Sequence, residues 1–429
     1  MRKTFKITQF AERVPVEYGI ILFNRMLGGM ILLSEDQLLL LDRNPKCFFG
    51  NRRGKLPENN IFIDDDVDED IRLSELHEET LISATSCGSL QCLELSVSEH
   101  CNYQCIYCTF WRHKSNSRRG LMSEELATRA LFDFAYITKG VEKPILYFGT
   151  GEPILNWRVI VEVGKKAFIL HPNIQLNLIT NGSLMTEEKL QFCQKYGISV
   201  GLSLDGLPET QKRQRLPASK NIDSSQAILD LLELGKRMGV NFSCLSGTYH
   251  KRGFLKDVSY LIDLCTRYHI PELDIDYDTG GLSENDNLDL IVGELIQGYK
   301  LARKADLNVF GYWMIPFLNI LNGKGNLKSF CGNIVGKSVC ITSDGNFKLC
   351  GYEPQSMSVY TNISDHLFSE PFRELCRNHL PGNNLLCKNC CLEGVCAGQC
   401  MLRDPNNPNW ALTCEFYRKS TFGLLATTK

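Results

Sequence analysis

The middle of the sequence, residues 91–305, alternates short apolar segments with longer amphipathic ones. The apolar segments predict six strands, at Cys92–Val97, Pro144–Phe148, Gln175–Ile179, Ser199–Leu204, Asn241–Leu245 and Glu272–Ile275. The segments between them predict helices at Ser123–Thr138, Trp157–His171, Glu187–Tyr196, Ser225–Met238 and Leu255–His269. Strands that alternate with helices of this length form βα units around a parallel sheet. The sequence therefore predicts an α/β fold, either a doubly wound sheet or a partial barrel, with its chemistry in loops at the carboxyl ends of the strands.

Two further regions flank this alternation. In residues 1–90, the apolar runs Tyr18–Phe23, Met30–Leu33 and Gln37–Leu41 predict two or three strands in a meander. The acidic run Asp64–Asp70 predicts a solvated loop, with a partner surface as the alternative. Residues 306–429 show little helical pattern and hold ten of the 19 cysteines. We therefore expect three domains, at 1–90, 91–305 and 306–429.

Composition excludes several classes of protein. Lys and Arg (47) nearly balance Asp and Glu (49), so the charge-driven attraction to nucleic acid that a basic protein has is missing. No apolar run approaches the length of a transmembrane helix, and the N-terminus lacks the apolar core of a secretory signal. We expect a cytoplasmic protein with no membrane partner. In that reducing compartment, thiols persist as thiolates or metal ligands. The isolated Cys193, Cys244 and Cys265 are predicted to be small buried hydrophobes.

The first cysteine cluster follows the strand Cys92–Val97 directly. Cys101, Cys105 and Cys108 have the spacing CxxxCxxC, which lets one loop surround a metal centre. Three thiolates do not complete the four ligands of an ordinary iron–sulfur or structural zinc site. One metal position would stay open, which favours chemistry. The alternative is a zinc knuckle with a remote fourth ligand, for which His100 or His113 could serve.

This motif, with the aromatic Tyr107 before the third cysteine, resembles the signature of the radical S-adenosylmethionine (AdoMet, or SAM) enzymes. The resemblance covers about residues 91–280 and implies a partial (β/α)6 barrel of the TIM type. It also implies a [4Fe–4S] cluster held by the three cysteines. In that family the open iron chelates AdoMet, and an electron from the cluster cleaves the sulfonium to release a 5′-deoxyadenosyl radical.

The ends of the other predicted strands fit the same family. Gly149-Thr150-Gly151-Glu152-Pro153 resembles its GGEP motif, with Thr150 in place of one glycine, and would receive the AdoMet amino group. Asn-Gly follows the third strand, and Ser-Leu-Asp-Gly closes the fourth, where the family contacts ribose and carboxylate. An arginine ten residues on matches one that pairs with the AdoMet carboxylate. The resemblance thus implies cofactor contacts from Tyr107, Gly149, Gly151, Glu152, Asn181, Ser203, Asp205 and Arg215.

The second cysteine field resembles the seven-cysteine SPASM domain of radical AdoMet enzymes that modify peptides. Its spacing is Cys331-x13-Gly345-x4-Cys350, then Cys387-x2-Cys390-x5-Cys396-x3-Cys400 and Cys414. The residues Ser343-Asp344-Gly345 predict a hairpin with a two-residue turn, which would bring Cys331 and Cys350 to one end. The resemblance implies two auxiliary [4Fe–4S] clusters and so three clusters in all. One would use Cys331, Cys350 and Cys400, and the other Cys387, Cys390, Cys396 and Cys414.

Three questions about this field stay open. The fourth ligand of the first auxiliary cluster is Cys340, Cys391 or an open position that binds substrate. A zinc site built from Cys387, Cys390, Cys396 and Cys400 is the alternative to a cluster. The whole chain could also be a non-catalytic cluster or zinc scaffold.

The resemblance implies an enzyme that modifies a ribosomally made precursor peptide. We expect this modification to be a crosslink. Its reductant would be a flavodoxin or ferredoxin. Residues 1–90 would bind the peptide's leader through an exposed strand edge, or else form a structural cap. The runner-up is formylglycine formation, as in sulfatase maturases, which place the three-cysteine motif near the N-terminus and an Asp base after the hairpin's second cysteine. Here 100 residues precede Cys101, and Gly351 stands at the second position. No catalytic residue is assigned.

Overall fold

The computed structural model describes residues 5–43, 59–109, 120–219, 221–323, 325–353, 355–400 and 409–428. Its centre is a curved sheet in which consecutive strands lie side by side and parallel to their neighbours. These strands are β6 (Cys92–Ser98), β7 (Ile145–Thr150), β8 (Gln175–Thr180), β9 (Ile198–Ser203), β10 (Cys244–Tyr249), β11 (Glu272–Tyr277) and β12 (Asn308–Phe310). The predicted α/β fold with a parallel sheet is confirmed.

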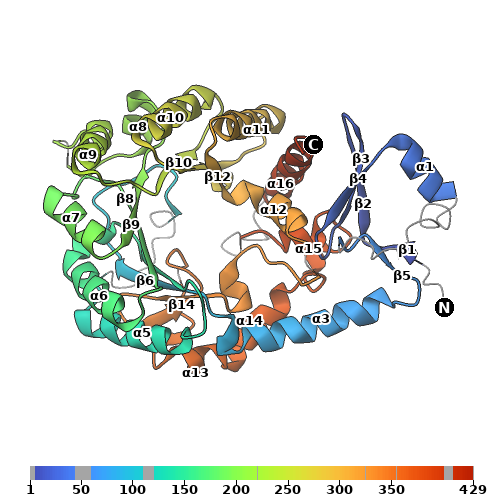
Figure 1. Cartoon of the computed structure of the whole chain (residues 1–429), viewed down its shortest axis with the longest axis horizontal. Coiled ribbons are helices and arrows are strands. Elements are labelled where there is room, and N and C mark those ends of the chain that lie inside the picture. The colour runs from blue at the N-terminus through green and yellow to red at the C-terminus, as the bar shows by residue number, and fades with distance from the viewer. Residues whose placement is uncertain are drawn as a thin grey trace.

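Helices cover the outer, convex side of this sheet, one after another in chain order (Figure 1). They are α5 (Glu124–Ile137), α6 (Trp157–Leu170), α7 (Glu187–Lys195), α8 (Pro208–Gln214), α9 (Ser224–Met238), α10 (Leu255–Tyr268) and α11 (Leu288–Lys304). Polar side chains begin several of them: Ser123 accepts from the Leu126 N–H, and Asp223 accepts from the N–H groups at the start of α9. Because β12 does not pair back to the other edge, the barrel is partial, as predicted.

Each barrel strand presents one face to the helices and the other to the lumen. In β6, Leu93, Leu95 and Val97 are fully buried in the core, whereas Glu94 and Ser96 lie on the opposite face. On β6, the concave side of the sheet is therefore polar, and its charged side chain lies in the middle of the strand.

One predicted strand is displaced. The segment Asn241–Leu245 was expected to be a strand, but β10 begins only at Cys244. The misleading apolar signal comes from Phe242, which is buried against Gly235 of α9 in the turn before the strand. The short helix α8, which begins with Pro208, was not predicted.

In the N-terminal region two of the predicted runs, Tyr18–Phe23 and Met30–Leu33, correspond to strands, and their partner strand Ala11–Val16 was not predicted. Strands β2 (Ala11–Val16), β3 (Gly19–Asn24) and β4 (Met30–Leu33) form an antiparallel sheet in that order. The third predicted strand, Gln37–Leu41, is wrong, because it lies in helix α1 (Glu35–Arg43). A capping box starts this helix: the Gln37 N–H donates to Ser34 Oγ (3.2 Å), and the Ser34 N–H donates to Gln37 Oε1 (2.9 Å).

The acidic run is only in part a loop. Its first residue, Asp64, ends β5 (Phe62–Asp64), which pairs with β1 (Phe5–Ile7). Asp68 caps helix α3 (Glu69–Ala84), accepting from the N–H groups of Asp70 and Ile71. Acidic groups at this end also favour the helix dipole. Helix α3 leads from the N-terminal sheet to α14 (Glu370–His379), against which it packs (Figure 1).

The predicted hairpin extends the central sheet. Strand β13 (Ser338–Ile341) runs parallel to β6 and antiparallel to β14 (Asn346–Lys348), which pairs with β15 (Ser358–Val359). The turn is longer than the expected two residues: the Gly345 N–H donates to the Thr342 carbonyl (3.0 Å), and Gly345 has a φ of 77°. This is the three-residue turn in which glycine takes the left-handed position.

The C-terminal region is more helical than expected. Besides α14 it contains α12 (Ile315–Leu321), α13 (Ile363–Leu367), α15 (Glu393–Cys396) and α16 (Trp410–Leu425). Its Phe347 and Phe416 share one hydrophobic core with Leu95 of the barrel and with Ile21 and Phe23 of the N-terminal sheet. None of the helices in the described ranges combines the length and apolar character needed to cross a bilayer.

The buried His366 makes stability depend on pH. Its ring stacks on Phe347 with centroids 4.0 Å apart, and burial lowers the pKa of His366 to about 4. The unfolded chain binds this proton near pH 6.5, so folding stability falls as the pH drops from about 6.5 to about 4. We expect His366→Gln to reduce the loss of stability between pH 7.5 and 5 by roughly 2 kcal/mol. Unfolding free energies of both proteins at pH 7.5 and 5 test this, and equal losses would contradict it.

Candidate active site

The first cysteine loop begins where β6 ends and is bonded to the end of β7. The Gly151 N–H donates to the Ser98 carbonyl (3.0 Å), and the Glu152 N–H donates to the His100 carbonyl (2.9 Å). A Cβ at position 151 would lie 2.3 Å from the His100 oxygen, so only glycine fits here. The predicted motif on β7 thus holds the start of the cysteine loop.

The thiols of Cys101, Cys105 and Cys108 share one partly buried site. Burial raises the pKa of Cys101 and of Cys105 to about 12, and the neighbouring thiols add to both shifts. The Tyr103 N–H lies 3.4 Å from Cys101 Sγ. A bound metal deprotonates its thiol ligands, which reverses this preference for the neutral form. His113, the candidate ligand for a zinc knuckle, lies outside the described residues.

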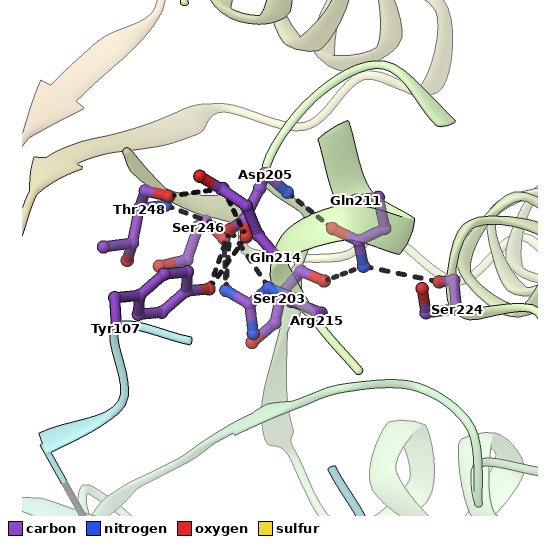
Figure 2. Close-up of polar contacts among 9 residues, drawn as sticks. All are labelled: Tyr107, Ser203, Asp205, Gln211, Gln214, Arg215, Ser224, Ser246 and Thr248. Carbon is purple, nitrogen blue, oxygen red and sulfur yellow. Dashed lines mark hydrogen bonds and ion pairs between the residues drawn. The ribbon is translucent and has the colours of Figure 1, made fainter. Parts of the chain in front are cut away.

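A buried carboxylate, Asp205 at the end of β9, holds the far side of the loop (Figure 2). The Tyr107 hydroxyl donates to both its oxygens, at 3.0 and 2.9 Å. Arg215 Nε donates to Oδ1 at 3.0 Å, and its Nη2 lies 3.0 Å from the same oxygen. Gln214 Nε2 and the Thr248 N–H complete the shell, at 3.0 and 3.1 Å. Tyr107 precedes Cys108, so this network positions the third cysteine.

Within this network, Arg215 pairs with a carboxylate of the protein itself. The family resemblance implies that Arg215 pairs with the AdoMet carboxylate, but in the structure its guanidinium faces Asp205 and the Ser246 carbonyl. Burial raises the pKa of Tyr107 well above its usual value, so its hydroxyl stays protonated and donates. Contact of Arg215 with AdoMet stays a prediction.

Glu152 joins the ends of β7 and β8. It is 1% exposed: Oε1 accepts from Thr180 Oγ1 (2.7 Å) and from the Ile154 N–H (3.1 Å), and Oε2 accepts from the Asn181 N–H (2.9 Å). Burial raises the pKa of Glu152. The Asn181 side chain donates to Asn102 Oδ1 (2.9 Å) in the cysteine loop. Ser203 lies almost buried at the end of β9. The structure therefore brings these predicted cofactor residues to one end of the barrel.

Thr150 has a φ of 85°, a left-handed conformation that β-branched residues very rarely adopt. The resemblance places a glycine in this motif where the chain has threonine. Its hydroxyl pairs with Ser96 Oγ on β6. Strain of this kind concentrates at functional sites, where the surrounding structure holds it in place.

The second cysteine field divides into two groups. Burial raises the pKa of Cys331 to about 11, and Cys400 adds to this shift. Burial also raises the pKa of Cys350, with contributions from Glu94, Cys400 and Cys331. These three thiols therefore lie near one another, beside β6. Cys340 is fully buried and lies 3.5 Å from Ser96 Oγ.

The other group lies around α15 and the start of α16. Burial raises the pKa of Cys387 to about 12, with contributions from Cys390 and Cys414. Burial raises the pKa of Cys396 as well, and the same three thiols add to it. The thiols of Cys390 and Cys391 lie close together and interact, which favours the loss of one proton from the pair and lowers the pKa of Cys390. The structure thus forms the two sets that the resemblance implies; their metal ligation stays a prediction.

Sequence reasoning missed a group of lumen residues between the two cysteine fields. Burial raises the pKa of Tyr147, Tyr312 and Tyr352, and the nearby Glu94 on β6 adds to each of these shifts. Cys108, Cys101 and Cys350 also contribute to the pKa of Tyr352, so this tyrosine lies between the first cysteine loop and the hairpin. The available signal was a glutamate inside an apolar strand, immediately before the cysteine motif.

A cavity of about 950 Å³ occupies the other half of the lumen, toward the amino ends of the strands. Its wall includes Tyr147, Ile179, Cys244 and Asp274. Burial, together with the neighbouring Glu272 and Asp276, raises the pKa of Asp274 to about 7. Tyr147 borders both this cavity and the group around Glu94, so the two spaces adjoin.

The Tyr107 contact yields a stability prediction. Tyr107→Phe removes a donor shared by both oxygens of a fully buried carboxylate, and we expect it to lower the unfolding free energy by about 1–3 kcal/mol. The matched control is Tyr136→Phe, at a tyrosine that is 71% exposed, where the change should stay within about 0.5 kcal/mol. Denaturant unfolding of anaerobic protein measures both, and equal effects would refute the role assigned to Tyr107.

Comparison with known proteins supports this geometry. Residues 95–257 match the model of the radical SAM superfamily. The radical SAM cyclopropyl synthase TigE of Paramaledivibacter caminithermalis is 26% identical over 345 residues, which cover 76% of this chain and 71% of that protein. A cysteine-type anaerobic sulfatase-maturating enzyme of Clostridium novyi is 26% identical over 372 residues, or 77% and 94% of the two chains.

Two solved structures have the same fold. Streptococcus suis SuiB bound to the precursor peptide SuiA superposes with a TM-score of 0.56 and 18% identity, over 92% of this chain and 95% of that one. The enzyme anSMEcpe with bound AdoMet has a TM-score of 0.58 and 19% identity, over 78% and 94%. These comparisons show a radical SAM domain over residues 95–257, which include the cysteine loop and the β7–β9 motifs, in a chain with the fold of SuiB and anSMEcpe.

Proposed function

We propose that this enzyme modifies a ribosomally made precursor peptide by forming a new bond within it. The observation that carries the proposal is that the first cysteine loop and Cys350 of the second field both lie near Tyr352, beside Glu94, whose Oε2 accepts from the Gly351 N–H. Thiols from one loop, partly buried and grouped, suit a [4Fe–4S] cluster with an open position. With AdoMet bound, such a cluster supplies the electron that cleaves the sulfonium and yields the 5′-deoxyadenosyl radical.

The chain's own residues would hold this cofactor pair. Cys101, Cys105 and Cys108 would ligate the cluster, and the Tyr107–Asp205–Arg215 network would keep their loop in place. The ends of β7, β8 and β9 would bind AdoMet. The groups Cys331/Cys350/Cys400 and Cys387/Cys390/Cys396/Cys414 would hold two auxiliary clusters that accept an electron when the new bond forms.

The N-terminal sheet supports a peptide substrate. Within the described residues, β4 pairs only with β3, which leaves its outer edge for an added strand. SuiB aligns with 92% of this chain, so the unaligned part is shorter than the N-terminal region and some of that region must align. The enzyme anSMEcpe aligns with 78% of this chain, so a larger part stays unaligned. SuiB was solved with its precursor peptide. We propose that residues 1–90 bind a leader as an added strand at the outer edge of β4.

Formylglycine formation is the second candidate, because the Clostridium novyi relative is a sulfatase-maturating enzyme. The chain also has the fold of anSMEcpe. The residue after the hairpin's second cysteine weighs against it. A Cβ at Gly351 would lie 2.3 Å from Thr150 Oγ1 and 2.4 Å from Glu94 Oε1. A side chain at this position is therefore excluded without other changes.

Metal content tests the cluster assignment. Anaerobically reconstituted protein should hold close to twelve iron and twelve sulfide per chain, which corresponds to three [4Fe–4S] clusters. Replacing Cys101, Cys105 and Cys108 together by Ala should remove about one third of both and abolish AdoMet cleavage under dithionite. The control Cys193→Ala, at a buried thiol in helix α7, should keep the full iron content. Stoichiometric zinc without iron in the anaerobic protein would refute the assignment.

The strand edge can be tested without deleting residues that share the barrel core. The register of β3 and β4, with the Asn24 N–H bonded to the Gly29 carbonyl, turns the Leu32 N–H away from β3. Leu32→Pro removes this N–H, and Leu32→Ala keeps it. With synthetic peptides that cover the short reading frames flanking the gene, we expect proline alone to reduce modification, by about tenfold or more.

The product is followed by mass spectrometry, where a crosslink removes two hydrogen atoms from the peptide. AdoMet cleavage without peptide should be the same in both Leu32 variants. Equal modification by the proline and alanine variants would refute leader binding at β4. Formylglycine in a sulfatase-derived cysteine peptide, with no modification of the flanking-frame peptides, would favour the second candidate.

A further inference from the structure

The carboxyl group of Glu94 lies in a space bounded by two glycines. Its Oε1 is 2.7 Å from the place of a Cβ at Gly149 and 2.4 Å from that of a Cβ at Gly351. The Gly351 N–H donates to Oε2 at 3.4 Å. Gly149 belongs to the predicted AdoMet motif, and Gly351 follows Cys350. The carboxyl group therefore reaches the lumen between the proposed cofactor site and the proposed auxiliary cluster.

The partners of Glu94 are neutral. Besides the Gly351 N–H, it interacts with Thr150 and Cys340 side chains. Among the residues that the structure describes, no Lys, Arg or His forms an ion pair with it. Glu94 is half-buried. A carboxyl group that is shielded from water and has no cation is costly for the folded state, and such groups concentrate at functional sites.

The proposed reaction has a task for this group. Hydrogen abstraction leaves a carbon radical on the peptide, and closing a bond to a second side chain then requires loss of one more hydrogen, as a proton and an electron. Resting on the proposed function, we propose that Glu94 is a catalytic residue: its carboxylate accepts this proton. The electron passes to an oxidised auxiliary iron–sulfur cluster. Two hydrogens leave the peptide, one in 5′-deoxyadenosine and one as proton plus electron.

The geometry explains why position 351 is glycine. The sulfatase maturases that the sequence resembles carry an Asp base directly after the hairpin's second cysteine. Here Glu94, reaching across from β6, together with Thr150 fills the space that such a side chain would need. The carboxylate is thus delivered to the same part of the lumen from a different strand.

The first test is Glu94→Gln, which keeps the shape and an oxygen that can accept from the Gly351 N–H, but accepts no proton at neutral pH. With the flanking-frame peptides as probe, crosslink formation should fall by about a hundredfold or more. Iron and sulfide content and AdoMet affinity, measured without peptide, should stay close to those of the parent enzyme. The control is Glu272→Gln, a lumen carboxylate at the opposite end of the barrel, which should retain crosslinking within about twofold.

The second test moves the carboxylate. Gly351→Asp alone should lower the melting temperature, because its side chain meets Glu94 and Thr150. Glu94→Ala with Thr150→Gly opens the space and should lose crosslinking like Glu94→Gln. Adding Gly351→Asp to that pair should restore crosslinking at least tenfold and cost little further stability, a rescue that a structural role for Glu94 does not produce.

Three outcomes would overturn the inference. Glu94→Gln could crosslink at the parent rate; it could lose iron together with product, which would make Glu94 structural; or Gly351→Asp could fail to restore product when it is added to the opened variant. If the parent enzyme modifies none of the peptides although it holds clusters and cleaves AdoMet, the proposed function itself is wrong, and the inference falls with it.

Discussion

The fully buried ion pair between Asp205 and Arg215 is the interaction on which the site depends. A carboxylate at the end of a barrel strand would be unstable in this interior without a cation and several donors. Arg215, Gln214, Tyr107 and the Thr248 N–H supply them, and they come from separate places along the chain. Because one donor is the residue before Cys108, the same bonds that satisfy Asp205 also fix the cysteine loop. The hydrogen bonds that stabilise the buried Asp205 carboxylate therefore also position the cysteine loop.

The hairpin of β13 and β14 has a comparable role on the other side of β6. By pairing β13 with β6, the fold places Cys350 beside the strand that leads into the first cysteine loop. Glu94 and Ser96, on the lumen face of β6, then contact Gly351 and Cys340 of the hairpin region. Strand β6 therefore contacts the hairpin region and leads directly into the first cysteine loop.

Local patterns predicted the βα units, because apolar spacing and capping residues act within a few positions of the chain. They failed where a tertiary contact used the same residues differently: Phe242 belongs to a turn packed on Gly235, and Gln37–Leu41 forms a helix capped by Ser34. The grouping of the cysteines was implied by the family resemblance. Contacts such as Tyr107–Asp205 and Glu94–Gly351 join residues about 100 and 250 positions apart. No local pattern encodes these contacts, and the φ of Thr150 likewise depends on them.

The pairing of β6 with β13 has a consequence for how the protein is made. Strand β6 leaves the ribosome about 250 residues before the strand that covers its outer edge. During synthesis this edge stays open, and pairing across so long a loop is slow and prone to wrong partners. Cys331, Cys350 and Cys400 follow β6 by more than 200 residues, so they reach their places long after that strand has been made. Assembly of the barrel and its cysteine sites is thus completed only once the residues up to Cys400 have been translated.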